Sequence, residues 1–156
     1  MNQQLKKSLI EYHRARGFVL YDSFPLVGND PTVLFTNATI TPFKRFFEDK
    51  NVVVHDYALI QRCLRVGGGA GGLDTAQSDP NYSSLFEMFG SGLFNSSYPA
   101  AAGYFLGMLG CTGLPVGHFR FTVPENSTFD EALRKNGVPS SSIFALKANG
   151  EFWQEW

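Results

Sequence analysis

An arginine stands just before a glycine-rich run in this chain, and its surroundings decide what chemistry it can do. Arg65 ends a mostly apolar segment and precedes the run at residues 67–72. A charged side chain at such a place needs an anion or a wet edge of the fold. Glu87, on the segment expected to return beside it, offers a salt bridge. A bound phosphate is the alternative, because guanidinium groups suit phosphate geometry.

Two phenylalanines lie close to Glu87 in the sequence. Phe86 and Phe89 fall on opposite faces of a segment that alternates apolar and polar residues. One of these rings can stack an adenine, whereas the alternative places both in the core. Arg65 together with one of these rings therefore predicts a site for a purine and a phosphate. The alternative, in which both rings pack in the core, stays open.

The glycines themselves match a dinucleotide fingerprint only formally. Gly67, Gly69 and Gly72 fit GxGxxG. That motif needs a helix directly after it, and residues 73–80 form a poor helix that ends in Pro80. The run instead predicts a flexible hinge between two strands. No GK[ST] string follows, so no P-loop is expected.

Other catalytic and metal chemistry finds little support in the sequence. The three histidines lie near no serine or cysteine in a recognisable nucleophile elbow. Cys63 and Cys111 are far apart, with no CxxC pair and no histidine at zinc-ligand spacing. We therefore predict two reduced thiols, no zinc and no other metal site.

The composition predicts a globular protein. Of 156 residues, 44% are hydrophobic and 17% charged, with a formal net charge of −1. This balance excludes a disordered chain and lacks the basic excess of proteins that bind nucleic acid non-specifically. No apolar run approaches about 18 residues, so no membrane association is expected. We predict a cytoplasmic protein; a basic, amphipathic N-terminus leaves organellar import as an alternative.

The elements that position these residues follow from periodicity. Leu5, Leu9 and Tyr12 have the spacing of a core-packed helix that Gly17 ends. Residues 57–66 and 85–89 predict two antiparallel strands joined by a long loop. Further strands are expected at residues 18–21, 32–36, 118–123 and 143–146. Further helices are expected at 41–47, at 99–109 where we expect burial, and after a cap at Ser127 or Thr128.

Four strings in this chain resemble one family. Residues 29–38, NDPTVLFTNA, resemble motif 1 of the alanyl-tRNA synthetases. Residues 61–68, QRCLRVGG, and residues 86–90, FEMFG, are similar to the two halves of motif 2. Residues 152–154, FWQ, resemble a further string of that family. Their order and spacing agree with the catalytic domain of this class II synthetase over nearly the whole chain.

The resemblance implies a fold and a set of roles. The fold is α+β: one class II synthetase-like domain over residues 1–156, with a mostly antiparallel sheet flanked by helices. Arg65 would contact the α-phosphate of ATP and, with Glu87, carry catalysis. Phe86 would stack on adenine with Met88 beside the nucleotide, and Trp153 would line the alanine pocket.

The sequence also departs from the family pattern. Gly69 stands where the family has a lysine, Gly72 where it has an aspartate, and residues 81–83 read Asn-Tyr-Ser where it has Arg-His-His. Cationic groups for the β- and γ-phosphates are therefore missing. The chain also ends just past the FWQ string, before motif 3. We accordingly expect a truncated domain whose ligand carries less charge than ATP, such as AMP or an adenylate.

Three functions remain open at this level. The chain activates or transfers a small amino acid such as alanine with a reduced adenylation site, or it is a non-catalytic binding paralogue, or it is one subunit of a split enzyme. Its cofactor would be ATP or AMP/adenylate, with or without Mg²⁺. We expect a homodimer or a protein partner, and no tRNA binding by this chain alone.

Overall fold

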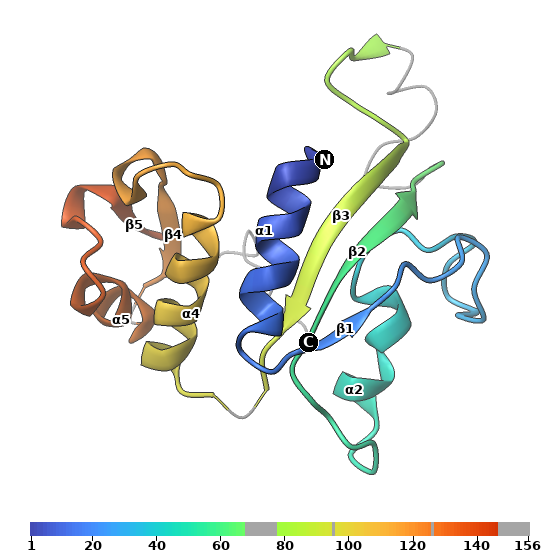
Figure 1. Ribbon diagram of the computed structural model, residues 1–156, viewed down its shortest axis with the longest axis horizontal. Helices are drawn as coiled ribbons and strands as arrows, with labels where there is room; N and C mark the ends of the chain where they lie inside the picture. The colour runs from blue at the N-terminus through green and yellow to red at the C-terminus, as the bar shows by residue number, and fades with distance from the viewer. Residues whose placement is uncertain (68–77, 95, 126, 147–156) are drawn as a thin grey trace. The chain divides into compact units, whose positions relative to one another are not determined.

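The computed structural model describes residues 1–67, 78–94, 96–125 and 127–146 (Figure 1). Two compact units follow one another along the chain: Met1–Phe94 and Asn95–Trp156. Each is described by itself below. Among the described residues, no helix has the length and apolar character needed to cross a lipid bilayer. Trp153 falls outside the described residues.

The first unit is built on a three-stranded sheet of order β1-β2-β3. β2 (Tyr57–Leu64) and β3 (Leu85–Gly92) pair antiparallel along their whole length, as the sequence predicted. β1 (Val19–Tyr21) joins the other edge of β2 in parallel, so the sheet is mixed. Helix α1 (Gln3–Arg14) runs alongside the sheet (Figure 1). Helices packed on a sheet confirm the α+β class.

Local signals explain the bounds of α1. The Asn2 side chain accepts hydrogen bonds from the amides of Gln4 and Leu5, at 2.8 and 3.3 Å, and caps the helix. Gly17, at φ +78°, adopts the left-handed conformation that ends it, as predicted. Leu9 is buried as its spacing indicated, but the most deeply buried side chain of the helix is His13.

His13 gives this helix a pH-dependent contact. The ring is fully buried, lies 5.1 Å from the Phe18 ring centroid and 5.0 Å from that of Phe89, and pairs through Nδ1 with the Leu9 carbonyl oxygen at 2.6 Å. Burial lowers the pKa of His13 below its usual 6.5; the nearby Arg16 charge adds to this, whereas the hydrogen bond to Leu9 opposes it. The neutral ring is therefore the form that packs.

We expect α1 to loosen on acidification. A histidine whose pKa is depressed by folding stabilises the fold fully above its unfolded pKa of about 6.5, and that contribution is lost as pH falls through the lower folded value. Between pH 7 and pH 5 the protection factors of the α1 amides should fall, which is an excess of exchange over the intrinsic rate, itself slower at lower pH. The excess should vanish in His13→Phe and persist in His118→Asn, which alters an exposed histidine. An identical excess in His13→Phe would contradict this assignment.

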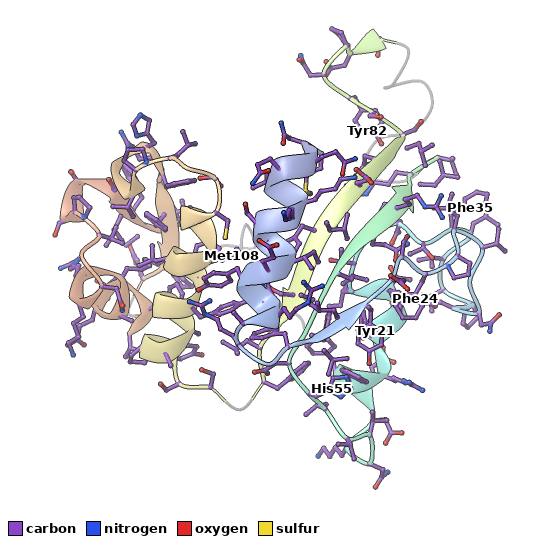
Figure 2. All side chains as sticks on the ribbon, viewed as in Figure 1. Tyr21, Phe24, Phe35, His55, Tyr82 and Met108 are labelled. Carbon is purple, nitrogen blue, oxygen red and sulfur yellow. The ribbon has the colours of Figure 1, made fainter. Side chains whose placement is uncertain are left out.

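The other face of the β1–β2 sheet packs on aromatic rings. Tyr57 stacks on Phe43 with ring centroids 3.8 Å apart, and Phe43 belongs to a 3₁₀ turn, η1 (Thr41–Phe43), that leads into α2 (Arg45–Glu48). These two short pieces confirm the helix predicted from residue 41, with Pro42 in its first turn. Tyr21, Phe24 and His55 lie beside this cluster (Figure 2).

The strand predicted at residues 32–36 is wrong. The segment consists of turns and bends, and Leu34 is 75% exposed. Asp30 starts the turn: its Oδ1 accepts hydrogen bonds from the Thr32 amide and hydroxyl, while Lys44 pairs with Oδ2 at 2.7 Å. These contacts, with Lys44 first, lower the pKa of Asp30 to about 2. A local side-chain turn has thus overridden β propensity.

The second unit has its own core. It contains α4 (Tyr98–Gly110), η2 (Val116–His118), α5 (Phe129–Lys135) and η3 (Ser140–Ser142), and its strands β4 (Phe121–Pro124) and β5 (Ile143–Leu146) pair in parallel. The buried core residues are Ala102, Phe121, Val123, Ala132, Leu133 and Val138. The predicted elements are present, with two corrections: the strand begins at Phe121 rather than His118, and of α4 only Ala102 is fully buried.

Candidate functional site

The register of β2 and β3 sorts the candidate residues onto two faces. Cys63 pairs with Phe86 and Gln61 with Met88, so these four side chains share one face of the hairpin. Arg62 pairs with Glu87 on the opposite face, the one covered by α1. Successive side chains on a strand point to opposite sides, which places neighbours in sequence on different surfaces.

Arg65 lies on the same face as Phe86. Its backbone amide donates to the Ser84 carbonyl oxygen at 2.9 Å, which extends the hairpin one step past β2. Its guanidinium carbon lies 5.1 Å from the Phe86 ring centroid, within cation–π range. Its Nε donates to the Asn37 carbonyl oxygen at 3.1 Å. The structure therefore brings Arg65 and Phe86 together, and Met88 lies two residues farther along the same face.

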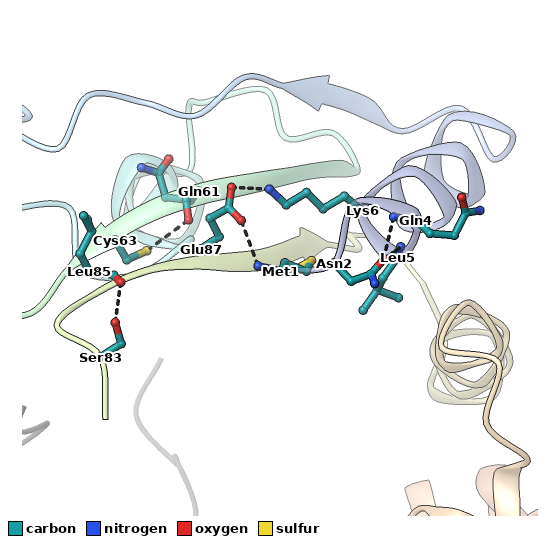
Figure 3. A network of polar contacts seen from close by, with 10 residues as sticks. All are labelled: Met1, Asn2, Gln4, Leu5, Lys6, Gln61, Cys63, Ser83, Leu85 and Glu87. Atoms are coloured by element: carbon teal, nitrogen blue, oxygen red, sulfur yellow. Dashed lines mark hydrogen bonds and ion pairs between the residues drawn. The ribbon is translucent and has the colours of Figure 1, made fainter. Parts of the chain in front are cut away.

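Glu87 does not form the salt bridge with Arg65 that the sequence offered as an alternative. It pairs with Lys6 of α1 at 2.5 Å and with the Met1 amino group at 3.2 Å (Figure 3). The hydrogen bond from Lys6, followed by that from Met1, lowers the pKa of Glu87. Among the described residues, Arg65 has no carboxylate ion-pair partner. The structure thus separates Glu87 from the Arg65 face.

A buried glutamine on this face, Gln61, ties the chain at Phe24 to β2. Gln61 is fully buried; its Oε1 accepts from the Phe24 amide at 2.9 Å, and its Nε2 donates to the Phe24 carbonyl oxygen at 3.0 Å. Nε2 also lies 2.6 Å from the Arg62 carbonyl oxygen. Sequence reasoning missed this residue. The available signal was a lone amide among the alternate positions Tyr57, Leu59 and Cys63, all of them buried.

A turn at residues 36–41 crosses the same face. The backbone amide of Leu64 donates to the Thr36 carbonyl oxygen at 3.0 Å, which places the turn beside the end of β2. The Thr39 hydroxyl lies 3.7 Å from the Met88 sulfur. The motif-like string at residues 29–38 had indicated a family, but it had not indicated that its end would contact Arg65. Such a long-range contact leaves no trace in local periodicity.

The comparisons with known proteins extend the resemblance over the whole chain. The family described as tRNA synthetases class II (A) matches residues 4–155. This chain belongs to the class II tRNA synthetases. Curated relatives are the alanine–tRNA ligases of Nitrosomonas europaea, at 32% identity over 98% of the chain, and of Parvibaculum lavamentivorans, at 33% over 97%. That of Shewanella amazonensis is 34% identical over 96%.

The match covers only a small part of each relative. The chain spans 18% of the first two ligases and 19% of the third. What is shared is thus the alanyl-tRNA synthetase-like catalytic domain family, to which the hairpin with Arg65 and Phe86 belongs. Class II synthetases as a family bind an amino acid, ATP and tRNA; which of these this chain binds is a separate question.

A pocket of the first unit, Met1–Phe94, lies away from Arg65. It has a volume of about 670 Å³ and is formed by the 24–36 segment with η1 and α2, and neither Arg65 nor Phe86 lines it. Among the described residues, no group of three or more His, Cys, Asp or Glu side chains could hold a metal ion. The chemistry that the Arg65 face offers therefore comes from one guanidinium and one ring, both half-buried, beside the 36–41 turn.

Proposed function

We propose that the Arg65 face of the hairpin binds the AMP part of a nucleotide or adenylate whose acyl group is a small amino acid such as alanine. The observation that carries this proposal is the Arg65 guanidinium, 5.1 Å from the Phe86 ring and held by the Asn37 carbonyl oxygen. A guanidinium fixed at Nε directs its remaining N–H groups as a fork, which suits a phosphate with two oxygens available.

Each residue has a distinct part in this proposal. Arg65 stabilises the charge on the α-phosphate, where negative charge builds up when a carboxylate attacks it. Phe86 contacts the purine; because the guanidinium already covers one side of the ring, the base uses the part that Arg65 leaves free. Met88 adds a polarisable surface beside it. Trp153 would line the amino-acid pocket, a prediction carried by the resemblance alone.

A catalytic role for Glu87 stays a prediction, and it depends on which face of the hairpin the substrate reaches. Its carboxylate lies on the α1 face and pairs with Lys6. It can meet a substrate group only if that group reaches this face, or if the carboxylate leaves the lysine. The contact with α1 supports instead a role in holding the helix to β3.

The charge of the ligand can be tested directly. Gly69, Asn81, Tyr82 and Ser83 stand where the resemblance leads us to expect cationic or metal-binding groups. We expect AMP and a non-hydrolysable alanyl-adenylate analogue to bind at least as tightly as ATP with Mg²⁺, because the extra phosphates gain no cationic partner. Calorimetric titration of the three ligands measures this. Clearly tighter binding of ATP would count against a reduced site.

Activity separates the remaining alternatives. Amino-acid-dependent exchange of pyrophosphate into ATP would support activation by this chain, whereas binding without exchange would support a non-catalytic paralogue. A subunit of a split enzyme would show exchange only with its partner chain, and a homodimer would show in sedimentation. Because the relatives are several times longer, tRNA charging is not assigned to this chain alone. A cytoplasmic location is part of the same proposal.

A further inference from the structure

The turn at residues 36–41, which holds Arg65, packs on β3 through a close contact between Thr39 and Gly90, called the Thr39 seat below. A Cβ atom added to Gly90 would lie 2.3 Å from Thr39 Oγ1, 2.4 Å from Thr39 Cβ and 2.8 Å from Thr39 Cγ2. The whole Thr39 side chain thus occupies the volume that any other residue at position 90 would need. Gly90 is required here because the turn approaches the strand closely.

We propose that Thr39, seated on Gly90, is a positioning residue that sets the direction of the Arg65 guanidinium; the inference deepens the proposed function and rests on it. Thr39 touches β3 at Gly90 and at the Met88 sulfur. Two residues earlier, the Asn37 carbonyl oxygen accepts the Arg65 Nε hydrogen bond at 3.1 Å. The height of the turn above β3 therefore determines where that carbonyl lies.

The turn is tied to neighbouring segments before Thr39, and Thr39 is its contact with β3. The Thr36 hydroxyl donates to the Pro25 carbonyl oxygen at 2.8 Å, and the Thr36 carbonyl oxygen accepts from the Leu64 amide. Within the turn, the Thr41 hydroxyl donates to Asn37 Oδ1 at 3.1 Å, which links position 41 to the residue whose carbonyl Arg65 uses. A change in the Thr39 seat moves the middle of the turn, and with it the carbonyl that Arg65 uses.

The seat matters for binding because hydrogen bonds to charged groups depend steeply on direction. A guanidinium bound at Nε and packed on Phe86 has little freedom, so its fork is oriented before a phosphate arrives. If the carbonyl moves away, Nε turns to water and the fork samples several directions. Ligand affinity then falls although Arg65 and Phe86 are both present.

Three variants of the full chain test the inference. Gly90→Ala lifts Thr39, Thr39→Gly removes the seat without adding an atom, and the double variant places the alanine methyl group in the vacated volume. Gly117→Ala is the control, because a Cβ there meets nothing within 4 Å. The readouts are water exchange of the Arg65 Nε–H proton by ¹⁵N NMR, assigned by its loss in Arg65→Lys, and calorimetric affinity for AMP.

Both single variants should speed exchange of the Nε–H proton and weaken AMP binding about tenfold, while circular dichroism stays that of the parent. The double variant should recover affinity to within about threefold, as volume-conserving changes do. In an Arg65→Ala background, Thr39→Gly should have no further effect on affinity. A merely structural role would change the unfolding temperature without this dependence on Arg65.

Distinct results would overturn the inference. Slow Nε–H exchange and parental AMP affinity in a folded Thr39→Gly protein would do so, and this variant decides the matter if Gly90→Ala fails to fold. If the parent protein binds neither AMP, ATP nor the adenylate analogue, the proposed function fails. The exchange rate still shows in that case whether Thr39 orients Arg65.

Discussion

Arg65→Ala should lower affinity for AMP and for an alanyl-adenylate analogue by about 30-fold or more, the largest loss that we expect from one substitution. The side chain contributes charge-assisted hydrogen bonds to phosphate, which are typically worth about 1.5–3 kcal/mol each. Calorimetric titration measures the loss. Arg65→Lys should recover part of it, since an ammonium keeps the charge but loses the fork and the Nε contact with Asn37.

Arg62→Ala is the matched control for this experiment. Arg62, in β2, precedes Arg65 by three residues, is exposed and lies opposite Glu87 in the strand register, on the α1 face. Its removal takes away the same charge without touching the proposed site, so affinity should change less than about twofold at physiological ionic strength, where charges on opposite faces are screened. Equal losses in the two variants would show a general charge effect, and unchanged binding in Arg65→Ala would reject the site.

Gln61→Leu should destabilise the protein by about 2–4 kcal/mol, although the change is from polar to apolar in a buried place. Leucine has a suitable size, but it leaves the amide and carbonyl groups of Phe24 without the partners they have in Gln61. Each buried group that loses its hydrogen bond costs about 1–3 kcal/mol, more than the added apolar contact returns. Urea unfolding should show a lower midpoint at an unchanged slope.

The same substitution has a local signature. Amide exchange should accelerate in residues 23–26, which the glutamine ties to β2, more than in the helix α1 on the opposite face. Gln4→Leu, on the exposed surface of α1, should change stability by no more than about 0.5 kcal/mol. Stability equal to the parent in Gln61→Leu would mean that water replaces the amide at no cost.

Periodicity predicted much of the first unit. The spacing of Leu5 and Leu9, followed by Gly17, gave the helix and its end, because amphipathic spacing and a left-handed glycine are local properties. The apolar run at 57–66 and the alternation at 85–89 gave the antiparallel pair for the same reason. Arg65 and Phe86 could be expected on one face once that pairing was assumed.

What the sequence could not supply was the long-range part of the site. The segment at 32–36 has β propensity, yet the turn begun by Asp30 and held by Lys44 prevents a strand. Glu87 looked like a partner for Arg65, but its position in the strand turns it toward Lys6. The ion pairs of Lys44 with Asp30 and of Lys6 with Glu87 join residues 14 and 81 positions apart. The turn at Asp30 is itself local, but neither ion pair can be read from a short window of sequence.

The two hydrogen bonds between Gln61 and the main chain of Phe24 also bear on which substitutions the chain tolerates. Gln61 contacts position 24 through main-chain atoms alone, so these hydrogen bonds do not restrict the side chain at position 24. At position 61, by contrast, no other residue type offers the same donor and acceptor at the same reach. Substitutions at positions 24 and 61 are therefore expected to accumulate independently of each other. Analyses that search for paired changes between contacting positions will overlook this contact.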